Sequence, residues 1–460
     1  MMRLKRAAAL LLTICMLLCL SACGGLGSGA RGEDPDTQNT QQGDPDLSET
    51  SDAPDPTDTE DPGEETVLPT PPAVHAGAQA LALQKQLYGL YEWADDNLLV
   101  HSAFSHVTLW HEDAEKYPEL AAALEQTAAM VKRSMEDEYD NLCATARVDL
   151  AGAGYGLETS VSTLDIQVRR ADSVAISLLS DSYSDYGWIE VFRGMHGTNY
   201  DTQTGQELKL SDVIKDMGPI PALVEQELNR HMWAGDFSYD GVVADYFRNT
   251  PEDGVSWTLD YNGVTFYFAD GDLAEPGNGR QTATVAFAEY PELFVEKYMS
   301  VPDAYTVELP LDSSFFTDLD GDGDLEELNI TGWYDSAMAM YTECGIYTDT
   351  DGFYHYEEYH CDGFHPYYVK TADGNHYLYL FCKQNQDPSP QMNLVVYDVT
   401  GGGLTRVGER NMGPACIPVD IIRIPTDPNS LWLDDYDGMA QDAMEYAVGS
   451  NGLPERKGES

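Results

Sequence analysis

The chain has 460 residues, of which 79 are acidic and 25 basic, so its formal net charge is −54. This charge argues against nucleic acid and anionic lipid surfaces as partners, because both attract positively charged proteins. Bound cations or a basic partner protein fit the composition better. The length is enough for two or three domains.

The first residues are typical of an exported protein. A basic start, Met1–Arg6, precedes an apolar run over residues 7–20, and we predict a secretory signal peptide over residues 1–22. The run is shorter than the ~20 apolar residues that a membrane-spanning helix needs. It ends in Leu-Ser-Ala-Cys at residues 20–23, which resembles the bacterial lipobox.

The lipobox resemblance implies that Cys23 carries a diacylglyceryl group and becomes the mature N-terminus. The protein is then expected on the outer face of the cytoplasmic membrane, anchored in the bacterial cell envelope by its lipid. The alternative is an ordinary signal peptide that happens to contain a cysteine. After Leu20 no apolar stretch is long enough to cross a bilayer, so we expect no cytoplasmic part.

Residues 23–76 have the composition of a linker. They are rich in Pro, Asp, Thr and Glu and contain almost no apolar residues, so they cannot bury enough surface to fold. A flexible coil of this length spans roughly 40 Å. We predict a disordered acidic tether that holds the folded part away from the membrane.

An α+β domain is predicted over residues 77–300, with an antiparallel sheet and two packed helices. One helix is expected from Pro118 to about Leu142, because apolar residues recur every three or four positions. The other is expected from about Pro219 to Met232. Strands are expected at 98–100, 104–110, 157–168, 174–179, 255–259, 263–268 and 282–287.

The composition changes near residue 300. Residues 301–450 are rich in Tyr, Asp and Gly, with turn sequences such as Thr350-Asp351-Gly352 between aromatic or β-branched runs. This pattern predicts a β-rich C-terminal domain of consecutive hairpins, followed by a short tail over 451–460.

Three segments of the first domain form a distinctive pattern. Residues 194–197 read Gly-Met-His-Gly, residues 199–213 read Asn-Tyr-Asp-Thr-Gln-Thr-Gly-Gln-Glu-Leu-Lys-Leu-Ser-Asp-Val, and residues 259–268 read Leu-Asp-Tyr-Asn-Gly-Val-Thr-Phe-Tyr-Phe. Together they resemble the RsiV-like extracytoplasmic domain, and the resemblance covers roughly residues 98–299. Within it, Gly205 stands where a hairpin needs a positive φ.

Members of that family include membrane anti-sigma factors whose outer domain binds lysozyme, and wall-modifying deacetylases. The resemblance therefore implies a binding or sensing module at the cell wall, with a wall component or a basic wall-active protein such as lysozyme as partner. The anti-sigma pattern is not met, because the sequence lacks a transmembrane helix and a cytosolic sigma-binding segment. The deacetylase catalytic domain is also missing from the sequence.

The strongest candidate site is the acidic segment 317–328. Carboxylates at alternate positions followed by glycine converge on a hard cation such as calcium. An EF-hand would need a glutamate at the position of Asn329, so a standard EF-hand is rejected. The segment looks like the Asp-x-Asp-Gly-Asp-Gly calcium loops of extracellular β-rich proteins. We predict a structural calcium ion, the alternative being an acidic surface turn. The predicted ligands are Asp318, Asp320, Asp322, Asp324, Glu326 and Glu327.

Histidines and cysteines give weaker signals. His196, in the Gly-Met-His-Gly segment, could contact a ligand or could hold a turn through its backbone neighbours. His355, His360 and His365 are five residues apart and cannot share one face of a strand, so we interpret them as solvated. Export permits disulfides, but the sequence does not decide the pairing among Cys143, Cys344, Cys361, Cys382 and Cys416.

No zincin, nucleophile-elbow, phosphate-loop or dinucleotide motif occurs in the sequence. We therefore expect a non-enzymatic, lipid-anchored binding or sensing protein with a calcium-stabilised C-terminal domain. The alternative is a cell-wall glycan hydrolase that uses a pair of Asp or Glu residues, or an accessory subunit of a wall-modifying enzyme. Carboxylate spacing in the sequence cannot test the hydrolase alternative.

Overall fold

The computed structural model describes residues 77–458, apart from several short gaps. Short gaps in the described range fall at 96, 154–157, 187–189, 232–236, 336–339, 351, 353, 362, 385–390, 415–420 and 437–440. The predicted signal peptide, Cys23 and the predicted linker lie outside the described residues.

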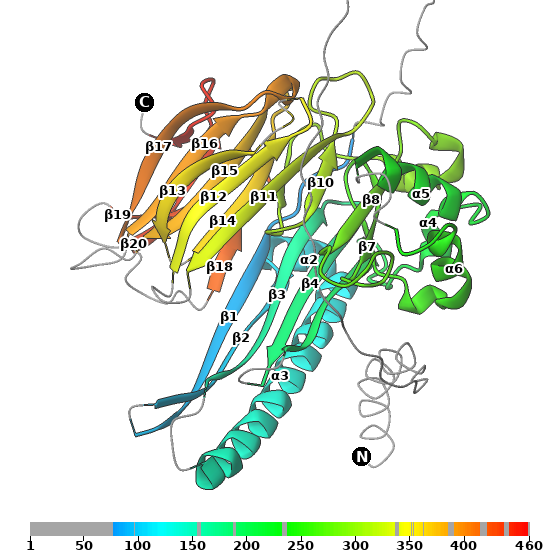
Figure 1. Ribbon diagram of the computed structural model, residues 1–460. Coiled ribbons are helices and arrows are strands. Elements are labelled where there is room, and N and C mark those ends of the chain that lie inside the picture. Colours follow the sequence, from blue (N-terminus) through cyan, green and yellow to red (C-terminus); the bar gives the residue numbers. More distant parts are fainter. Residues whose placement is uncertain are drawn as a thin grey trace, which may run out of the picture. The chain divides into compact units, whose positions relative to one another are not determined.

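A six-stranded sheet forms the first half of the fold (Figure 1). Its strand order is β18-β1-β2-β3-β4-β5, and all neighbours are antiparallel except β2 and β3. The strands are β1 (Leu83–Ala94), β2 (Asn97–Leu109), β3 (Ser160–Ala171), β4 (Ala175–Asp185), β5 (Glu190–Asp201) and β18 (Ile421–Ile424). The predicted α+β fold class is confirmed, and strands β2, β3 and β4 lie near their predicted places. Strands β1 and β5 were not predicted.

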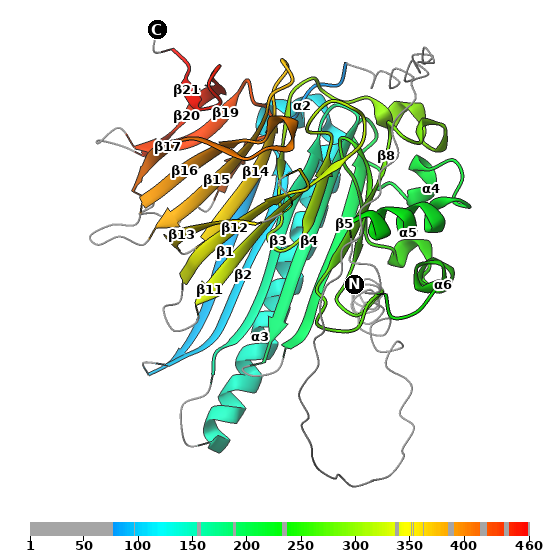
Figure 2. The same cartoon turned by 45° about the horizontal axis from the view of Figure 1, so that its top comes forward.

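Two helices, α2 (His111–Lys116) and α3 (Pro118–Ala153), connect the parallel strands β2 and β3. Parallel strands need such a crossover, and Figures 1 and 2 show α3 running along the sheet. The helix begins at Pro118 as predicted but continues well past Leu142. Its second half packs Leu142, Cys143 and Ala146 against Leu99 and Val100 of β2, because the β1–β2 hairpin is long enough to support it there.

The turn after β5 brings the helix and the sheet together. Gly205 has φ +65°, and a Cβ atom there would lie 2.5 Å from the backbone of Glu119 in the first turn of α3. Only glycine permits both this backbone conformation and this close approach. The predicted role of Gly205 as a positive-φ turn residue is therefore confirmed.

A smaller antiparallel sheet, β6-β7-β8, packs with short helices around a second core. Its strands and the predicted helix near Pro219 are confirmed, whereas α6 was not predicted. The elements are α4 (Leu210–Val213), α5 (Ile220–His231), α6 (Val242–Asn249), β6 (Trp257–Leu259), β7 (Gly263–Phe268) and β8 (Gln281–Ala286), with 3₁₀ turns at Glu252–Gly254, Pro291–Leu293 and Glu296–Met299.

The second half of the chain consists of antiparallel sheets, as predicted. The orders are β10-β11-β12-β13, β17-β16-β15-β14-β9 and β19-β20-β21. The strands are β9 (Tyr305–Glu308), β10 (Ser314–Thr317), β11 (Glu326–Asp335), β12 (Met340–Thr348), β13 (His355–Cys361), β14 (Gly363–Lys370), β15 (His376–Gln384), β16 (Gln391–Asp398), β17 (Thr405–Pro414), β19 (Leu431–Tyr436), β20 (Gln441–Val448) and β21 (Pro454–Arg456).

The five-stranded sheet is buried on both faces. In β15, Tyr377 and Tyr379 belong to the core shared with the first sheet, whereas Leu378 and Leu380 belong to the core shared with the β10–β13 sheet. This explains why the strand sequence is continuously apolar rather than alternating. The sheet therefore links the two halves of the fold.

The predicted boundary near residue 300 separates two sets of sheets that share a core. Strand β18, from the C-terminal region, extends the N-terminal sheet by pairing with residues Leu83–Gln86 of β1. In addition, the Thr426 hydroxyl donates a hydrogen bond to the Leu81 carbonyl, 2.7 Å away. Whether either region folds alone stays a prediction.

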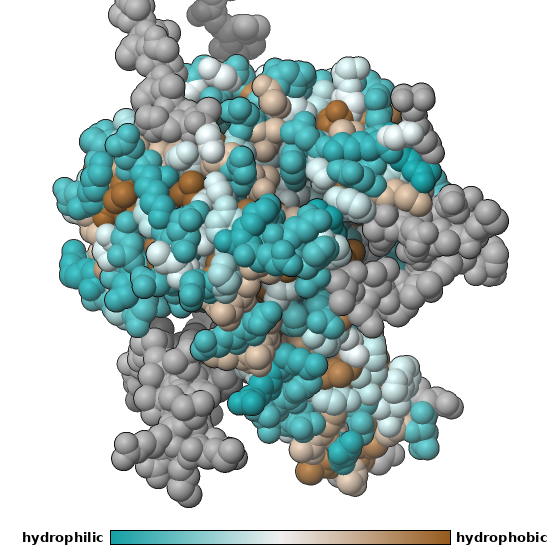
Figure 3. Space-filling view, turned by 180° about the vertical axis from the view of Figure 1, so that it is seen from behind, coloured by the Kyte–Doolittle hydropathy of each residue, from teal (hydrophilic) through white to brown (hydrophobic). Residues whose placement is uncertain are grey.

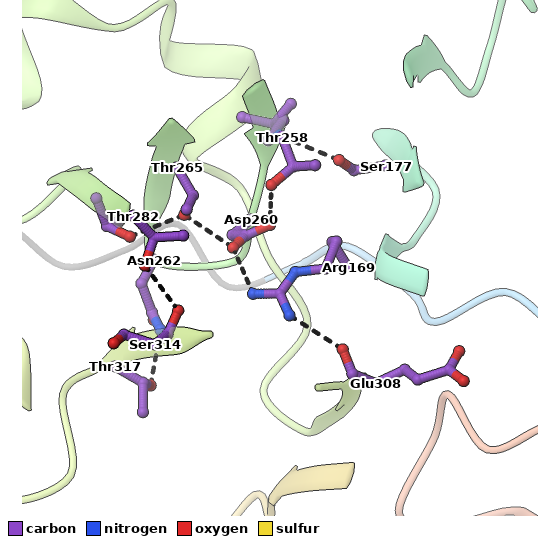
Figure 4. A network of polar contacts seen from close by, with 12 residues as sticks. Arg169, Ser177, Thr258, Asp260, Asn262, Thr265, Thr282, Glu308, Ser314 and Thr317 are labelled. Atoms are coloured by element: carbon purple, nitrogen blue, oxygen red, sulfur yellow. Dashed lines mark hydrogen bonds and ion pairs between the residues drawn. The ribbon is translucent and has the colours of Figure 1, made fainter. Parts of the chain in front are cut away.

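A buried polar network joins the sheets at the centre of the fold (Figure 4). Arg169 of β3, with 1% of its surface exposed, donates to the Asp260 carboxylate at 2.9 Å and to the Glu308 carbonyl at 3.0 Å. Asp260 also accepts hydrogen bonds from Thr258 and Thr265. One guanidinium group thus connects the first sheet with the β6–β8 sheet and with β9.

The neighbouring residue, Arg170, is also fully buried. It donates to the Asp172 carboxylate and to the carbonyls of Tyr298 and Ser300, each at 2.7 Å. A bulge between β3 and β4 occurs at this point of the strand, and both side chains point into the interior. Glu308 adds a third ion pair, accepting from the Lys85 ammonium at 2.6 Å.

The face of the molecule in Figure 3 is mostly hydrophilic, with scattered apolar patches. Within the described residues, no helix combines the length and the apolar character that a bilayer-spanning segment requires. Cys143, Cys344, Cys361 and Cys382 are buried free thiols, and Cys416 lies outside the described residues.

Removing one partner of the buried Arg169–Asp260 pair leaves an uncompensated charge in the core. We expect Asp260→Ala to lower the free energy of unfolding by about 3–5 kcal/mol, measured by chemical denaturation. The control is Arg406→Ala, which removes the exposed pair with Glu409 and should cost about 0–1 kcal/mol. Equal losses in the two variants would contradict a central role for the buried pair.

Candidate metal centre

The predicted acidic segment forms the loop between β10 and β11. The two strands are antiparallel, with Thr317 opposite Glu326. Asp318, the first residue after β10, is therefore held close to Glu326, the first residue of β11. The strand ladder brings together two carboxylates that are eight positions apart in the sequence.

Three carboxylates converge in this loop. The ligand oxygens of Asp318, Asp320 and Glu326 all lie within 4.8 Å of one another. Asp318 and Glu326 are half-buried and Asp320 is exposed. Within the described part of the chain, no other group of three or more His, Cys, Asp or Glu side chains has such geometry. The triad could hold a metal ion.

Backbone contacts hold the loop in this shape. Asp318 accepts a hydrogen bond from the Gly321 amide at 2.6 Å, and Glu326 accepts one from the Leu319 amide at 2.6 Å. Gly321 has a φ of +83°, which favours glycine. Leu319 is buried and its carbonyl accepts a hydrogen bond from the Gly401 amide at 2.7 Å, so the loop is fixed to the core near its start.

The loop concentrates negative charge. Burial raises the pKa of the Asp318 carboxyl, against the hydrogen bond from Gly321 and the positive charge of Lys370. Burial, together with the negative charges of Asp320 and Asp318, raises the pKa of Glu326 to about 7. Without a cation, burial and the neighbouring negative charges therefore disfavour ionisation of Glu326, as expected for a crowded anionic site.

The other predicted ligands lie outside this triad. Asp322 and Asp324 are exposed, and Asp322 accepts a hydrogen bond from the Asp324 amide at 2.9 Å. Glu327 follows Glu326 on the strand, so its side chain points to the opposite face and accepts a hydrogen bond from the Ser314 hydroxyl. Sequence spacing alone did not separate Glu326 from Glu327, since both are close to the loop.

His196 is far from a turn. It lies inside β5, opposite Ser180 of β4, and its side chain is exposed. The prediction that Gly-Met-His-Gly forms a turn is therefore wrong. A side chain at Gly197 would overlap the Trp257 carbonyl oxygen, so this glycine permits β6 to approach β5 closely rather than reversing the chain.

The three histidines of the segment 355–365 also lie on strands. On β13, His355 is half-buried and His360 is exposed. His365 is exposed on β14. Their separation on the strands agrees with the interpretation that they do not form one site.

The sequence matches no family model and no curated protein. The structure is similar to crystal structures of two DUF3298 family proteins, the family of the RsiV-like domain. For the one from Bacteroides fragilis the TM-score is 0.35 at 13% identity, over 48% of this chain and 98% of that one. For the one from Pseudomonas aeruginosa the TM-score is 0.31 at 14% identity, over 49% and 97%. These likenesses concern the fold over about half of the chain.

If the triad binds calcium, the ion should stabilise the fold. Extracellular sites bind calcium at about 10⁻⁴–10⁻³ M, so 10 mM calcium should raise the free energy of unfolding by about 1–3 kcal/mol. We expect Asp320→Ala and Glu326→Gln to abolish this increase and the heat of calcium titration. Glu327→Gln is the matched control and should keep both. Loss of the response in Glu327→Gln alone would contradict this ligand assignment.

Calcium affinity should also depend on pH. The cation binds the ionised carboxylates, and the pKa of Glu326 is about 7, so binding should weaken as the pH falls. Between pH 8 and pH 6 we expect about a tenfold loss of affinity in calorimetric titrations. An affinity that stays constant over this range would show that Glu326 does not compete with protons for the ion.

Proposed function

We propose that the protein is a lipid-anchored component of the bacterial cell envelope that binds a wall ligand, with a calcium ion stabilising its C-terminal sheets. The observation that carries the calcium part of the proposal is the convergence of the Asp318, Asp320 and Glu326 carboxylates within 4.8 Å. Calcium prefers such oxygen ligands, and water and backbone carbonyls complete its shell of six to eight.

The placement of the triad supports a structural role for the ion. The loop directly precedes β11, and β11 pairs with both β10 and β12. Neutralising the three carboxylates would remove their repulsion at the start of this sheet. The loop also contacts Gly401, shortly after the end of β16. A bound ion would therefore stabilise the connection between the β10–β13 sheet and the five-stranded sheet, which share a core.

Location at the outer face of the membrane is proposed from the sequence. The basic start, the apolar run and the Leu-Ser-Ala-Cys ending place Cys23 where a lipidated cysteine is expected. The space outside the membrane supplies calcium at the concentrations that such sites need. The acidic composition suits a basic or cation-bridged partner rather than an anionic one.

A binding role is proposed because the sequence carries none of the catalytic motifs considered above. The buried charged side chains also have structural partners: Arg169 with Asp260, Arg170 with Asp172, and Lys85 with Glu308. These groups are engaged in holding the sheets together.

The lipid anchor can be tested in cells. We expect labelled palmitate to enter the wild-type protein, and Cys23→Ser to remove the label and release the protein from the membrane fraction. Cys19→Ser is the control, because Cys19 lies in the part removed with the signal peptide, and it should change neither result. Membrane retention of unlabelled Cys23→Ser protein would contradict lipid anchoring.

A further inference from the structure

The β10-β11-β12-β13 sheet carries a row of aromatic side chains on the face that points away from the core. The sheet covers the five-stranded sheet with its other face (Figure 1). The row consists of Trp333 on β11, Tyr347 on β12, Tyr354 directly before β13 and Tyr356 on β13. Trp333, Tyr354 and Tyr356 have 53%, 36% and 54% of their surfaces exposed.

The four rings form a continuous line across three strands. Ring centroids are 5.8 Å apart for Trp333 and Tyr356, 5.9 Å for Tyr356 and Tyr354, and 5.2 Å for Tyr354 and Tyr347. Tyr354 and Tyr356 are stacked with an interplanar angle of 24°. Contacts of this kind stabilise a sheet only modestly, by about 0.2–1 kcal/mol per cross-strand pair.

A glycine beneath the rings makes the row possible. Gly345 of β12 lies opposite Tyr356 and Thr331 in the two neighbouring strands. A Cβ atom there would lie 3.0 Å from the Tyr356 ring, 3.2 Å from the Tyr354 ring and 2.7 Å from the Thr331 hydroxyl. A side chain at this position would push the rings out of line. Large aromatic side chains that touch one another and remain exposed are typical of a binding surface.

Carboxylates flank the rings. Glu343 of β12 and Glu358 of β13 are exposed and directly opposite each other. Like charges in such a pair destabilise a sheet, and a ligand that donates hydrogen bonds or carries positive charge would relieve the repulsion. The same carboxylates repel anionic polymers. The face therefore suits a flat ligand with apolar C–H surfaces and with N–H or O–H donors at its edges.

We propose that this aromatic row binds a linear polysaccharide of amino sugars. The C–H face of each sugar, which is slightly positive, stacks on the negative face of an aromatic ring. The sugar hydroxyl, amide or ammonium groups donate to Glu343 and Glu358 at the edge of the row. This charge complementarity selects amino sugars over acidic glycans. The inference deepens the proposed wall-binding role and rests on it, but it uses residues separate from the calcium triad.

The test uses the purified full chain with soluble oligomers of N-acetylglucosamine and of glucosamine, measured by calorimetry. We expect at least one oligomer to bind, and to be recovered at its original length. Trp333→Ala and Tyr356→Ala should each weaken binding roughly three- to tenfold, while Trp333→Phe keeps a ring and most of the affinity. Trp93→Ala is the matched control, because Trp93 is 57% exposed on β1, and it should leave binding unchanged.

Several outcomes would overturn the proposal. These are absence of binding to either oligomer, binding that Trp333→Ala and Tyr356→Ala leave intact, or a ring-dependent affinity for a polylysine peptide without glycan binding. The last result would assign the row to a cationic protein partner. Unchanged melting temperatures confirm that each variant folds. Glu326→Gln should still bind the oligomers, which separates failure of the calcium assignment from failure of this one.

Discussion

The arrangement of the sheets depends on two adjacent arginines that are withdrawn from water. Burying a guanidinium group is costly unless charged and polar partners surround it. Arg169 and Arg170 obtain those partners from Asp260, Asp172 and three backbone carbonyls on segments far apart in the sequence. Each of these segments therefore has to lie at a fixed position relative to β3.

This requirement limits how the chain can pass from the first set of sheets to the second. The carbonyls of Tyr298, Ser300 and Glu308 all accept hydrogen bonds from the arginines, so the chain near residue 300 is fixed to β3. The Glu308 carboxylate then binds Lys85. The change in composition near residue 300 thus coincides with a segment that is hydrogen-bonded to the buried arginines.

Much of the fold could be predicted from the sequence, because periodic apolar positions in α3 and the apolar strands β7 and β8 are local signals. Strand β1 was not predicted, because most of its outward-facing side chains are exposed and one of its buried positions is occupied by a charged residue, Lys85. Lys85 pairs with Glu308, which lies 223 positions further along the sequence. No local pattern reveals such a partner.

The acidic loop shows the same limit at the site. The sequence indicated the acidic segment, and from its six predicted ligands the structure brings together Asp318, Asp320 and Glu326, which could hold a metal ion. Which of Glu326 and Glu327 faces Asp318 depends on the register of β10 and β11. The alternation of side chains along a single strand does not reveal that register. The prediction that His196 lies in a turn was wrong, because the glycine that follows it allows two strands to approach closely and does not mark a turn.

The pairing of β18 with β1 has a consequence for biogenesis. The first sheet acquires its last strand from residues 421–424, more than 300 positions after β1. During synthesis, the Leu83–Gln86 part of the β1 edge therefore stays open until nearly the whole chain has been made, and such a long-range closure is slow. An incomplete chain would present this unpaired strand edge to other molecules, and an open edge of that kind is a template for association with other chains.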